Sequence, residues 1–454
     1  MVGCPTCGAA LRFDIASQKM ACDHCGNLFE TQKLSDNSSR DDARSSQFDS
    51  YVYICPSCGA ELLTTDKNDA VGFCQYCGGA SMIFNKMRQE WKPDHIIPFQ
   101  ITKEQCKELY LKEARRSIFT SGKYRDPKLI EGFRGIYMPY WSYQAAQKGA
   151  YILEGEKKGA FTKKTYRISG NVDLELDGFG HDASRSFADR ISEDLAPFDP
   201  NGHKPFAPGY LSGFYADVGD VNAHDYDQLA TREITEDTAR LMAKDDSSAH
   251  ADGGMQKIRI DTKKATIPTA ITAAHRTLYP VWFMSYRNQD KITYAAVNGQ
   301  TGKVSADLPV SPWKILITVL IVGVLLAAAL FVLPSVKAVG ALGVSLGLLL
   351  TGTLILRHSF HIAVTKENGL FDTEEAVRFR KGEKWRLLAM IVTLVIGAGV
   401  IYLDPAYNII TYLCCIGAAV ELFCFMISHI RFQAAIAKRE PPQFKKKGAA
   451  YDEK

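Results

Sequence analysis

Eight of the twelve cysteines lie within the first 77 residues, where they form four Cys-x2-Cys pairs. The two pairs of each set are separated by 14 residues in the first set and by 15 in the second. The eight residues are Cys4, Cys7, Cys22 and Cys25, followed by Cys55, Cys58, Cys74 and Cys77. Two such pairs bring four thiolates onto one tetrahedral Zn²⁺, at a Zn–S distance of about 2.3 Å. The spacing therefore predicts two zinc ions.

A glycine directly follows the second cysteine of every pair, at Gly8, Gly26, Gly59 and Gly78. Glycine suits the tight turn that such a pair requires, because it adopts positive φ without a steric penalty. Four thiolates leave no coordination position for a water molecule, so both sites are expected to be structural and not catalytic. Redox-active cysteine pairs are the alternative, but they do not account for two matched sets.

The charge of the cysteine-rich region bears on its binding partner. Residues 1–90 contain eight basic and eleven acidic side chains, a net charge of −3, although the whole chain carries +4. Two Zn²⁺ ions with four thiolates each add about −4. Because binding to DNA or RNA depends on several contacts from Lys or Arg to phosphates, nucleic acid is a disfavoured partner. Docking of another protein is the favoured use of these modules.

The elements that position the cysteines follow from a repeat with a period of about 51 residues, in which CPTCGAAL recurs as CPSCGAEL. We expect a multidomain chain with two small β zinc ribbons, a β-rich α+β domain and a four-helix transmembrane region. The α+β domain contains a possible duplicated strand unit, in the segments IYMPYWSY and LYPVWFMSY. Thr102 and Gln105 have the spacing of a capping box and predict the start of a helix. The expected divisions are a first ribbon (1–34), a flexible linker (35–50), a second ribbon (51–90), a cytosolic α+β domain (91–312), a transmembrane region (313–430) and a basic cytosolic tail (431–454).

Four apolar runs near the C-terminus are long enough to cross the roughly 30 Å hydrocarbon core of a bilayer. They cover about 315–333, 339–356, 387–403 and 409–427. The loop of 357–386 and the tail after residue 430 each contain seven Lys or Arg residues, whereas the two short connections contain only Lys337. The positive-inside rule then places the long loop and both termini on the cytosolic side of the membrane. The first residues show no signal peptide, and the reducing cytosol favours thiolate ligands over disulfides.

Three further residues are weaker site candidates. Glu421 is the one charged residue inside the four runs, and a carboxylate within a membrane is a candidate for transport or proton relay. A packing role is the alternative. Gly343 and Gly347 form a GxxxG pattern that permits close contact between helices, including contact within a homo-oligomer.

Residues 1–312 resemble the bacterial YdjG-like family of transcription-factor-IIB-type zinc-ribbon membrane proteins. The resemblance rests on the ribbons together with IIPF, YMPYW, LAPFDPNGHKPFAPGYLSGFYAD and LYPVWFMSY. It implies a membrane platform without enzymatic activity, whose cytosolic part works with phage-shock-protein-A-like or flotillin-like partners in envelope stress. Only the eight cysteines are carried over as functional residues. We therefore expect a membrane-anchored adaptor, with a membrane-tethered nucleic-acid-binding regulator and a transporter component using Glu421 as the alternatives.

Overall fold

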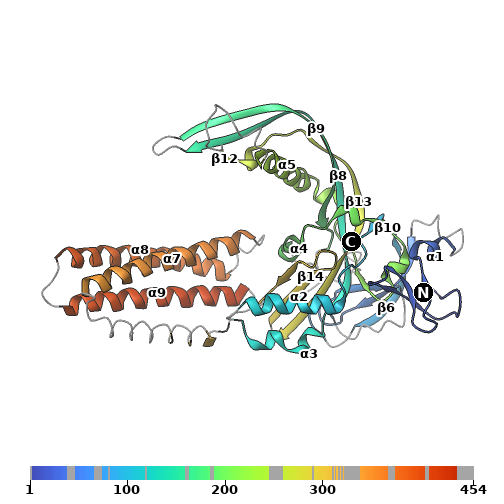
Figure 1. Cartoon of the computed structure of the whole chain (residues 1–454), viewed down its shortest axis with the longest axis horizontal. Coiled ribbons are helices and arrows are strands. Elements are labelled where there is room, and N and C mark those ends of the chain that lie inside the picture. The colour runs from blue at the N-terminus through green and yellow to red at the C-terminus, as the bar shows by residue number, and fades with distance from the viewer. Residues whose placement is uncertain are drawn as a thin grey trace, which may run out of the picture.

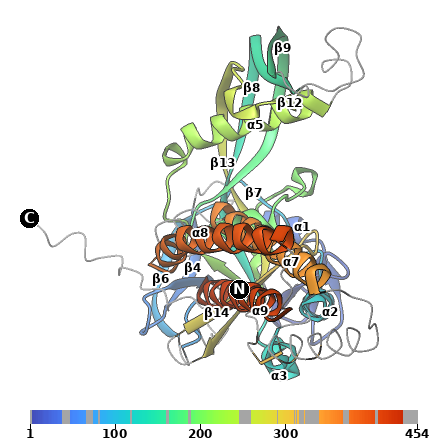
Figure 2. The same cartoon turned by 90° about the vertical axis from the view of Figure 1, so that its left-hand side faces the viewer.

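In a computed structural model, the chain forms a β-rich body with the N-terminal residues at one end and a bundle of three long helices at the other (Figure 1). A long two-stranded arm rises from the body, as the end-on view makes clear (Figure 2). Apart from a few single positions between 311 and 321, the structure describes residues 3–37, 47–65, 74–79, 82–117, 120–158, 163–184, 189–244, 259–288, 291–308, 338–366, 374–403 and 408–436.

The first ribbon is a three-stranded antiparallel sheet that is followed by helix α1. Its elements are β1 (Leu11–Asp14), β2 (Lys19–Cys22), β3 (Leu28–Phe29) and α1 (Thr31–Asn37). Phe13 is buried, and its ring packs edge-on against Tyr210 with 5.2 Å between the ring centroids. The backbone N–H of Phe13 also donates to the carbonyl oxygen of Ser212 at 3.1 Å. The first ribbon therefore packs against the body.

A 12-stranded sheet forms the body, and its main path runs β10-β7-β13-β8-β11-β5-β4-β6. Its strands are β4 (Gln47–Ile54), β5 (Glu61–Thr64), β6 (Ile83–Trp91), β7 (His95–Ile96), β8 (Arg134–Lys158), β9 (Lys163–Asp182), β10 (Lys204–Pro205), β11 (Tyr215–Asp217), β12 (Arg259–Ile260), β13 (Thr269–Asn288), β14 (Lys291–Asn298) and β15 (Val304–Ala306). β5 pairs with β11, which in turn pairs with β8, so the second ribbon shares a sheet with residues 91–312. The expected division at residue 90 does not coincide with a break in this sheet. Helix α1 and strand β4 both extend into the expected linker of 35–50, of which 38–46 lie outside the described residues.

The two Pro-x-Trp segments lie side by side, because β8 and β13 pair antiparallel with Met138 opposite Tyr279. About this point the two strands are related by a local two-fold axis. On the edge away from this pairing, each strand changes its partner at its proline. β8 pairs with β11 before Pro139 and with β9 after it, and β13 pairs with β7 before Pro280 and with β14 after it. A proline is tolerated in these central strands because no ladder hydrogen bond needs its missing N–H at such a change.

The two tryptophans of these segments make matching hydrogen bonds. The indole N–H of Trp141 donates to the carbonyl oxygen of Val221 at 2.9 Å, and that of Trp282 donates to Ile101 at 2.7 Å. Each acceptor lies five residues after the last parallel pair that a short strand, β11 or β7, makes with β8 or β13. The relation therefore extends to a β-α-β-β unit that occurs twice, once as β7-α2-β8-β9 and once as β11-α5-β13-β14.

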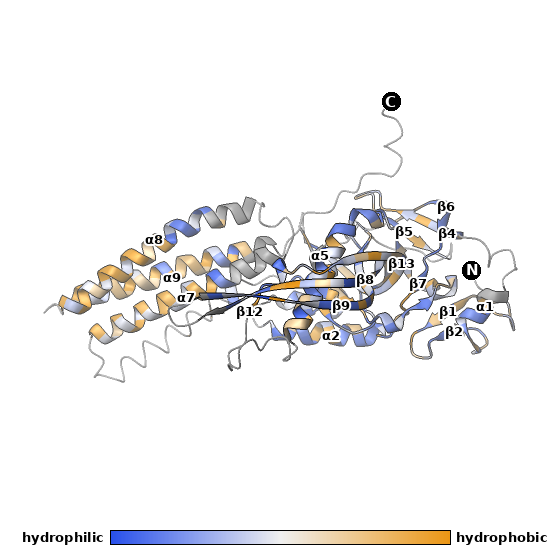
Figure 3. Cartoon of the chain, turned by 90° about the horizontal axis from the view of Figure 1, so that it is seen from above, coloured by the Kyte–Doolittle hydropathy of each residue, from blue (hydrophilic) through white to orange (hydrophobic). Residues whose placement is uncertain are grey.

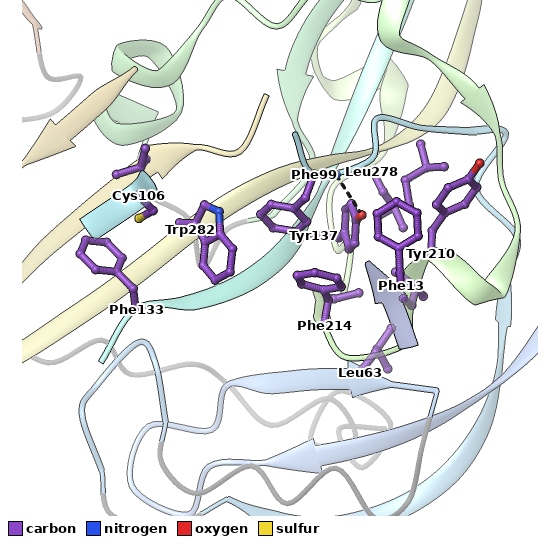
Figure 4. Packing of buried hydrophobic residues seen from close by; sticks show 14 of the residues in the cluster. Phe13, Leu63, Phe99, Cys106, Phe133, Tyr137, Tyr210, Phe214, Leu278 and Trp282 are labelled. Atoms are coloured by element: carbon purple, nitrogen blue, oxygen red, sulfur yellow. Dashed lines mark hydrogen bonds between the residues drawn. The ribbon is translucent and has the colours of Figure 1, made fainter. Parts of the chain in front are cut away.

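Aromatic side chains fill the core between the sheet and the first ribbon (Figure 4). Phe99 is fully buried and stacks on Phe214 with 4.6 Å between the ring centroids. Its ring also contacts Tyr137 and Trp282, at centroid distances of 5.0 and 5.1 Å. The backbone N–H of Phe99 donates to the hydroxyl oxygen of Tyr137 at 3.4 Å, the dashed line in Figure 4. This cluster joins the ribbon, the sheet and the segment after β7.

The helices of the body begin where the sequence signals them. Thr102 caps helix α2, and both hydrogen bonds of the capping box with Gln105 are present, which confirms that prediction. The acidic segment after β11 forms α5, which packs against β13 and the arm. The helices are α2 (Lys103–Arg116), α3 (Pro127–Ile130), α4 (Asp189–Leu195) and α5 (Asp227–Lys244).

Three C-terminal helices are long and apolar enough to cross a membrane, and hydrophobic residues predominate in them away from the body (Figure 3). They are α7 (Ala338–Lys366), α8 (Glu374–Leu403) and α9 (Asn408–Ile436). They contain the expected spans of 339–356, 387–403 and 409–427. The described residues thus show three such helices where we expected four, and the remaining span, 315–333, lies outside them except at positions 317 and 321. At most 22% of any of the three apolar windows is buried by protein, so lipid is the natural cover for the rest.

Candidate metal centres

The eight cysteines form the two groups that their spacing predicts. Within each group the four Sγ atoms lie within 4.8 Å of one another. In the first group, Sγ of Cys4 is 3.6 Å from that of Cys25. In the second group, Sγ of Cys55 is 3.5 Å from that of Cys77. Four sulfurs on one tetrahedral zinc ion stand about 3.8 Å apart, so both groups have nearly the required size.

All four Cys-x2-Cys turns share one backbone pattern, which explains their glycines. In the first turn, the N–H of Gly8 donates to the carbonyl of Cys4 at 2.8 Å, and the N–H of Cys4 donates to Ala9 at 2.7 Å. The same two bonds recur in the other three turns. The glycines have φ between +65° and +81°, which confirms the expected role. They are Gly8, Gly26, Gly59 and Gly78.

The second site lies inside the body. All four of its cysteines are buried, none with more than 3% of its surface exposed. Tyr76, within the second turn, is buried, and its carbonyl oxygen accepts a hydrogen bond from the hydroxyl of Tyr294 on β14 at 2.8 Å. A Cβ atom added at Gly78 would lie 3.2 Å from Cβ of Arg287 on β13. The turn that supplies Cys74 and Cys77 is thus packed directly against the two strands.

The first site is nearer the surface. Cys4 and Cys22 are buried, whereas Cys7 is exposed. Its ribbon is held by Phe13 and by Gln18, whose side-chain amide donates to the carbonyl oxygen of Phe99 at 2.7 Å. The two sites therefore share a ligand set and differ in surroundings: the second is part of the sheet's core, and the first is docked onto it.

The charge of the thiols fits a cation in each group. A hydrogen bond from the Cys74 thiol, which outweighs the effect of burial, lowers the pKa of Cys58 to about 6, and the same bond raises the pKa of Cys74. Four adjacent thiolates would repel one another, and a divalent ion removes that repulsion. By contrast, burial raises the pKa of the Cys106 thiol, which lies in the aromatic core and outside both groups. Two Cys4 groups suited to zinc are therefore present.

The candidates in the bundle lie apart from both groups. Glu421 accepts a hydrogen bond from the Thr393 hydroxyl at 2.8 Å. Arg357 of α7, which could have paired with Glu421, forms an ion pair with Glu383 of α8 instead, at 3.1 Å.

The GxxxG glycines make no close contact among the described residues: a Cβ atom at Gly343 or Gly347 would meet nothing within 4 Å. The close helix contacts occur at Gly352 and Gly397. An added Cβ atom there would lie 2.8 Å from Leu422 and 2.5 Å from Leu346.

One residue important to the second site was not singled out from the sequence. A Cβ atom at Gly79 would lie 3.2 Å from Sγ of Cys77 and 3.3 Å from Oγ of Ser57, so a larger residue would press on the ligands. The Gly78-Gly79 doublet after the last cysteine is the signal that could have revealed it. The bond from Tyr294 to Tyr76 joins residues 218 positions apart, and no local pattern indicates it.

Comparison with known proteins gives one informative likeness. No protein-family model matches the chain, and no solved structure matches it. Over 321 residues, which are 69% of this chain and 91% of the relative, the chain is 26% identical to the uncharacterized protein YdjG of Bacillus subtilis (strain 168), and this likeness supports a place in a YdjG-like family.

Proposed function

We propose that the chain is a non-catalytic, membrane-anchored adaptor. It presents surfaces for protein docking, in modules that zinc stabilises, on the cytosolic side of a bacterial membrane. The observation that carries the proposal is the burial of the second Cys4 group in the core of the large sheet. Zinc held by four buried thiolates has no position for substrate or water and serves to fix the fold. α7 and α9 end, and α8 begins, on the side of the body (Figure 1), which is the side that the basic loop and tail assign to the cytosol.

Strand β6 of the second ribbon supports protein docking. It stands at the end of the strand path and pairs only with β4 among the described residues. Its large apolar side chains are strongly exposed: Ile83 by 57%, Phe84 by 41%, Met87 by 59% and Trp91 by 57%. We call these four residues the docking strip. An exposed edge strand with apolar side chains accepts an extended segment of another protein, through backbone hydrogen bonds and side-chain contacts.

The partner classes in this proposal are phage-shock-protein-A-like and flotillin-like proteins. The family resemblance motivates them, and the apolar docking strip on an acidic ribbon suits a protein better than a nucleic acid. The relative named above is itself uncharacterized and adds nothing about partners.

The docking strip gives the test. Met87→Asp puts a charge at the centre of the strip without disturbing the core, because the Met87 side chain is 59% exposed. We expect recovery of a soluble partner, cross-linked in cells under envelope stress and purified in detergent, to fall about tenfold or more, which corresponds to about 1.4 kcal/mol. Quantitative mass spectrometry of the purified material is the measurement. Leu241→Asp on α5, where the leucine is 65% exposed, is the matched control and should leave recovery unchanged. Equal recovery with both variants would contradict the proposal.

Glu421 tests the transporter alternative. In the adaptor, Glu421 and Thr393 form a packing contact between α9 and α8. Glu421→Gln keeps an acceptor for the Thr393 hydroxyl and removes the ionisable group, so the level of protein in the membrane and the recovery of partner should stay within about twofold of wild type. Immunoblotting of membranes and the same cross-linking assay measure both. A solute or proton flux in proteoliposomes that this substitution abolishes would favour a transporter.

A further inference from the structure

The segments that follow β7 and β11 occupy equivalent places in the duplicated unit. After β7, the backbone N–H of Ile101 donates to the carbonyl oxygen of Gly299 at 2.8 Å. After β11, the N–H of Val221 donates to the carbonyl oxygen of Ala183 at 3.2 Å. In both segments the preceding N–H donates to the same carbonyl. Each residue of the first segment therefore has a counterpart 120 residues further along the chain in the second.

The two copies differ at the residue that should fill the space between the segment and the sheet. In the first copy this residue is Phe99, whose fully buried ring occupies that space (Figure 4). Gly299 makes room for the ring, since an added Cβ atom there would lie 2.6 Å from it. In the second copy the counterpart of Phe99 is Gly219, and Ala183 stands in the place of Gly299. The second copy thus lacks the ring that closes the first.

A cavity of about 240 Å³ takes the place of the ring in the second copy. Trp141 and Leu278 line it. These residues are the counterparts of Trp282 and Tyr137, whose rings contact Phe99 in the first copy. Because a cavity of about 150 Å³ is large enough to bind benzene, this one has room for an aromatic ring.

The cavity adjoins the docking strip. Trp91, which ends the strip and is 57% exposed, lines the cavity together with Phe48 of β4. Aromatic walls favour an aromatic occupant, through stacked and edge-to-face contacts. The charged residues among those described around the cavity are one base, Arg276, and three acids, Glu90, Asp217 and Asp220. This excess of acidic groups disfavours an anionic ligand such as a nucleotide.

We propose that this cavity receives an aromatic side chain of the protein that docks on β6. The role rests on the proposed function and adds the chemistry by which the partner is recognised. The ring of the partner completes the second copy as Phe99 completes the first. Aromatic side chains that enter a pocket of the other protein contribute much of the affinity of an interface. The partner segment that lies along β6 should therefore contain an aromatic residue close to Trp91.

Gly219→Phe tests this role by supplying the ring from within the chain. The φ of Gly219 lies outside the left-handed region, and an added Cβ atom would have its nearest contact at 3.4 Å, with Cβ of Pro139. Because the new ring fills an apolar cavity, the unfolding midpoint of the body should stay unchanged or rise by a few degrees. Both zinc ions should remain bound. Gly219→Ala, which leaves most of the cavity open, is the matched control.

Recovery of the soluble partner, in the cross-linking assay described above, is the first measurement. It should fall about fivefold or more with Gly219→Phe and stay within about twofold of wild type with Gly219→Ala. Photolabelling of the full chain in nanodiscs is the second. N-acetyl-4-azidophenylalanine amide should label the residues around the cavity, as mapped by mass spectrometry, and Gly219→Phe should reduce this labelling about fivefold or more. N-acetylphenylalanine amide should compete with the label more strongly than N-acetylleucine amide does.

The outcomes separate the role of the cavity from the docking itself. Undiminished recovery with Gly219→Phe, where Met87→Asp lowers it, would overturn the role of the cavity and leave the adaptor standing. Unchanged recovery with Met87→Asp would overturn both. Capture of a second, differently tagged copy of this chain in place of another protein would assign the cavity to self-association and also overturn the proposal. If Gly219→Phe lowers the midpoint, the wild-type chain decides, because absence of labelling around the cavity or equal competition by the two amides would contradict an aromatic site.

Discussion

Cys58→Ser should release one zinc ion and strongly destabilise the body, whereas Cys7→Ser should release one zinc ion and leave the stability of the large sheet almost unchanged. Both cysteines occupy the second position of a first Cys-x2-Cys pair, so the two substitutions are matched in chemistry. They differ in surroundings, since Cys58 is 3% exposed within the sheet's core and Cys7 is exposed on a docked ribbon. Loss of the second site would release the turn that contains Tyr76, whose carbonyl oxygen accepts a hydrogen bond from Tyr294 on β14.

The expected difference is large. Apparent binding of a structural zinc ion contributes about 10–16 kcal/mol to folding in zinc-finger peptides. If Cys58→Ser lowers the free energy of unfolding of the body by about a third of that contribution, the unfolding midpoint of the body should fall by about 10 °C or more. Cys7→Ser should shift the midpoint of the body by only a few degrees. Metal analysis should give two zinc ions per wild-type chain and one in each variant, with membrane insertion intact in both. Unfolding of the detergent-purified protein, followed by tryptophan fluorescence, measures the difference.

Two results would contradict this account. Equal shifts in midpoint for the two variants would mean that the second site does not stabilise the sheet more than the first. Fewer than two zinc ions in the wild-type chain would contradict the assignment of one zinc ion to each Cys4 group. Acidification gives an independent check on thiolate ligation, because protons compete with zinc for the sulfurs and should release the metal as the pH falls.

The local parts of the metal sites could be predicted from sequence because neighbouring residues determine them. Each Cys-x2-Cys-Gly turn closes on itself through hydrogen bonds within six residues, and the following glycine meets the need for positive φ. The capping box at Thr102 is local in the same sense. The apolar runs that became α7, α8 and α9 also needed only composition and length. In each case the information lies within one short window.

The relation between the modules could not be predicted in that way. β5 joins the sheet through Leu62 and Leu63, opposite Asp217 and Ala216, about 150 residues away. Many short apolar strands in the chain could have met that edge equally well, so the pairing depends on the packing of the whole body. The expected break at residue 90 rested on the cysteine repeat, which describes ligand geometry and contains no information on which sheet the ribbon joins. Similarly, the two Pro-x-Trp segments indicated a duplication but not that they pair with each other.

Phe99→Ala should destabilise the body by about 3–5 kcal/mol, the largest effect we expect from any substitution outside the metal sites. Phe99 is fully buried, and its ring contacts the rings of Tyr137, Phe214 and Trp282. Its removal leaves a cavity among three rigid aromatic groups that belong to different strands and loops, and such groups relax poorly into a void. Phe99→Leu retains much of the volume and should lose about 1–2 kcal/mol less.

Denaturation of the zinc-loaded protein in detergent measures this loss, and Leu241→Ala on the exposed face of α5 serves as the reference for a surface truncation. The zinc content should remain at two, because Gln18 bonds to the backbone carbonyl of Phe99, which alanine retains. A loss below about 1 kcal/mol would mean that the ribbon, the sheet and the segment after β7 do not share one core. The full expected loss with both zinc ions still bound would show that the aromatic cluster, and not the metal alone, joins the first ribbon to the sheet.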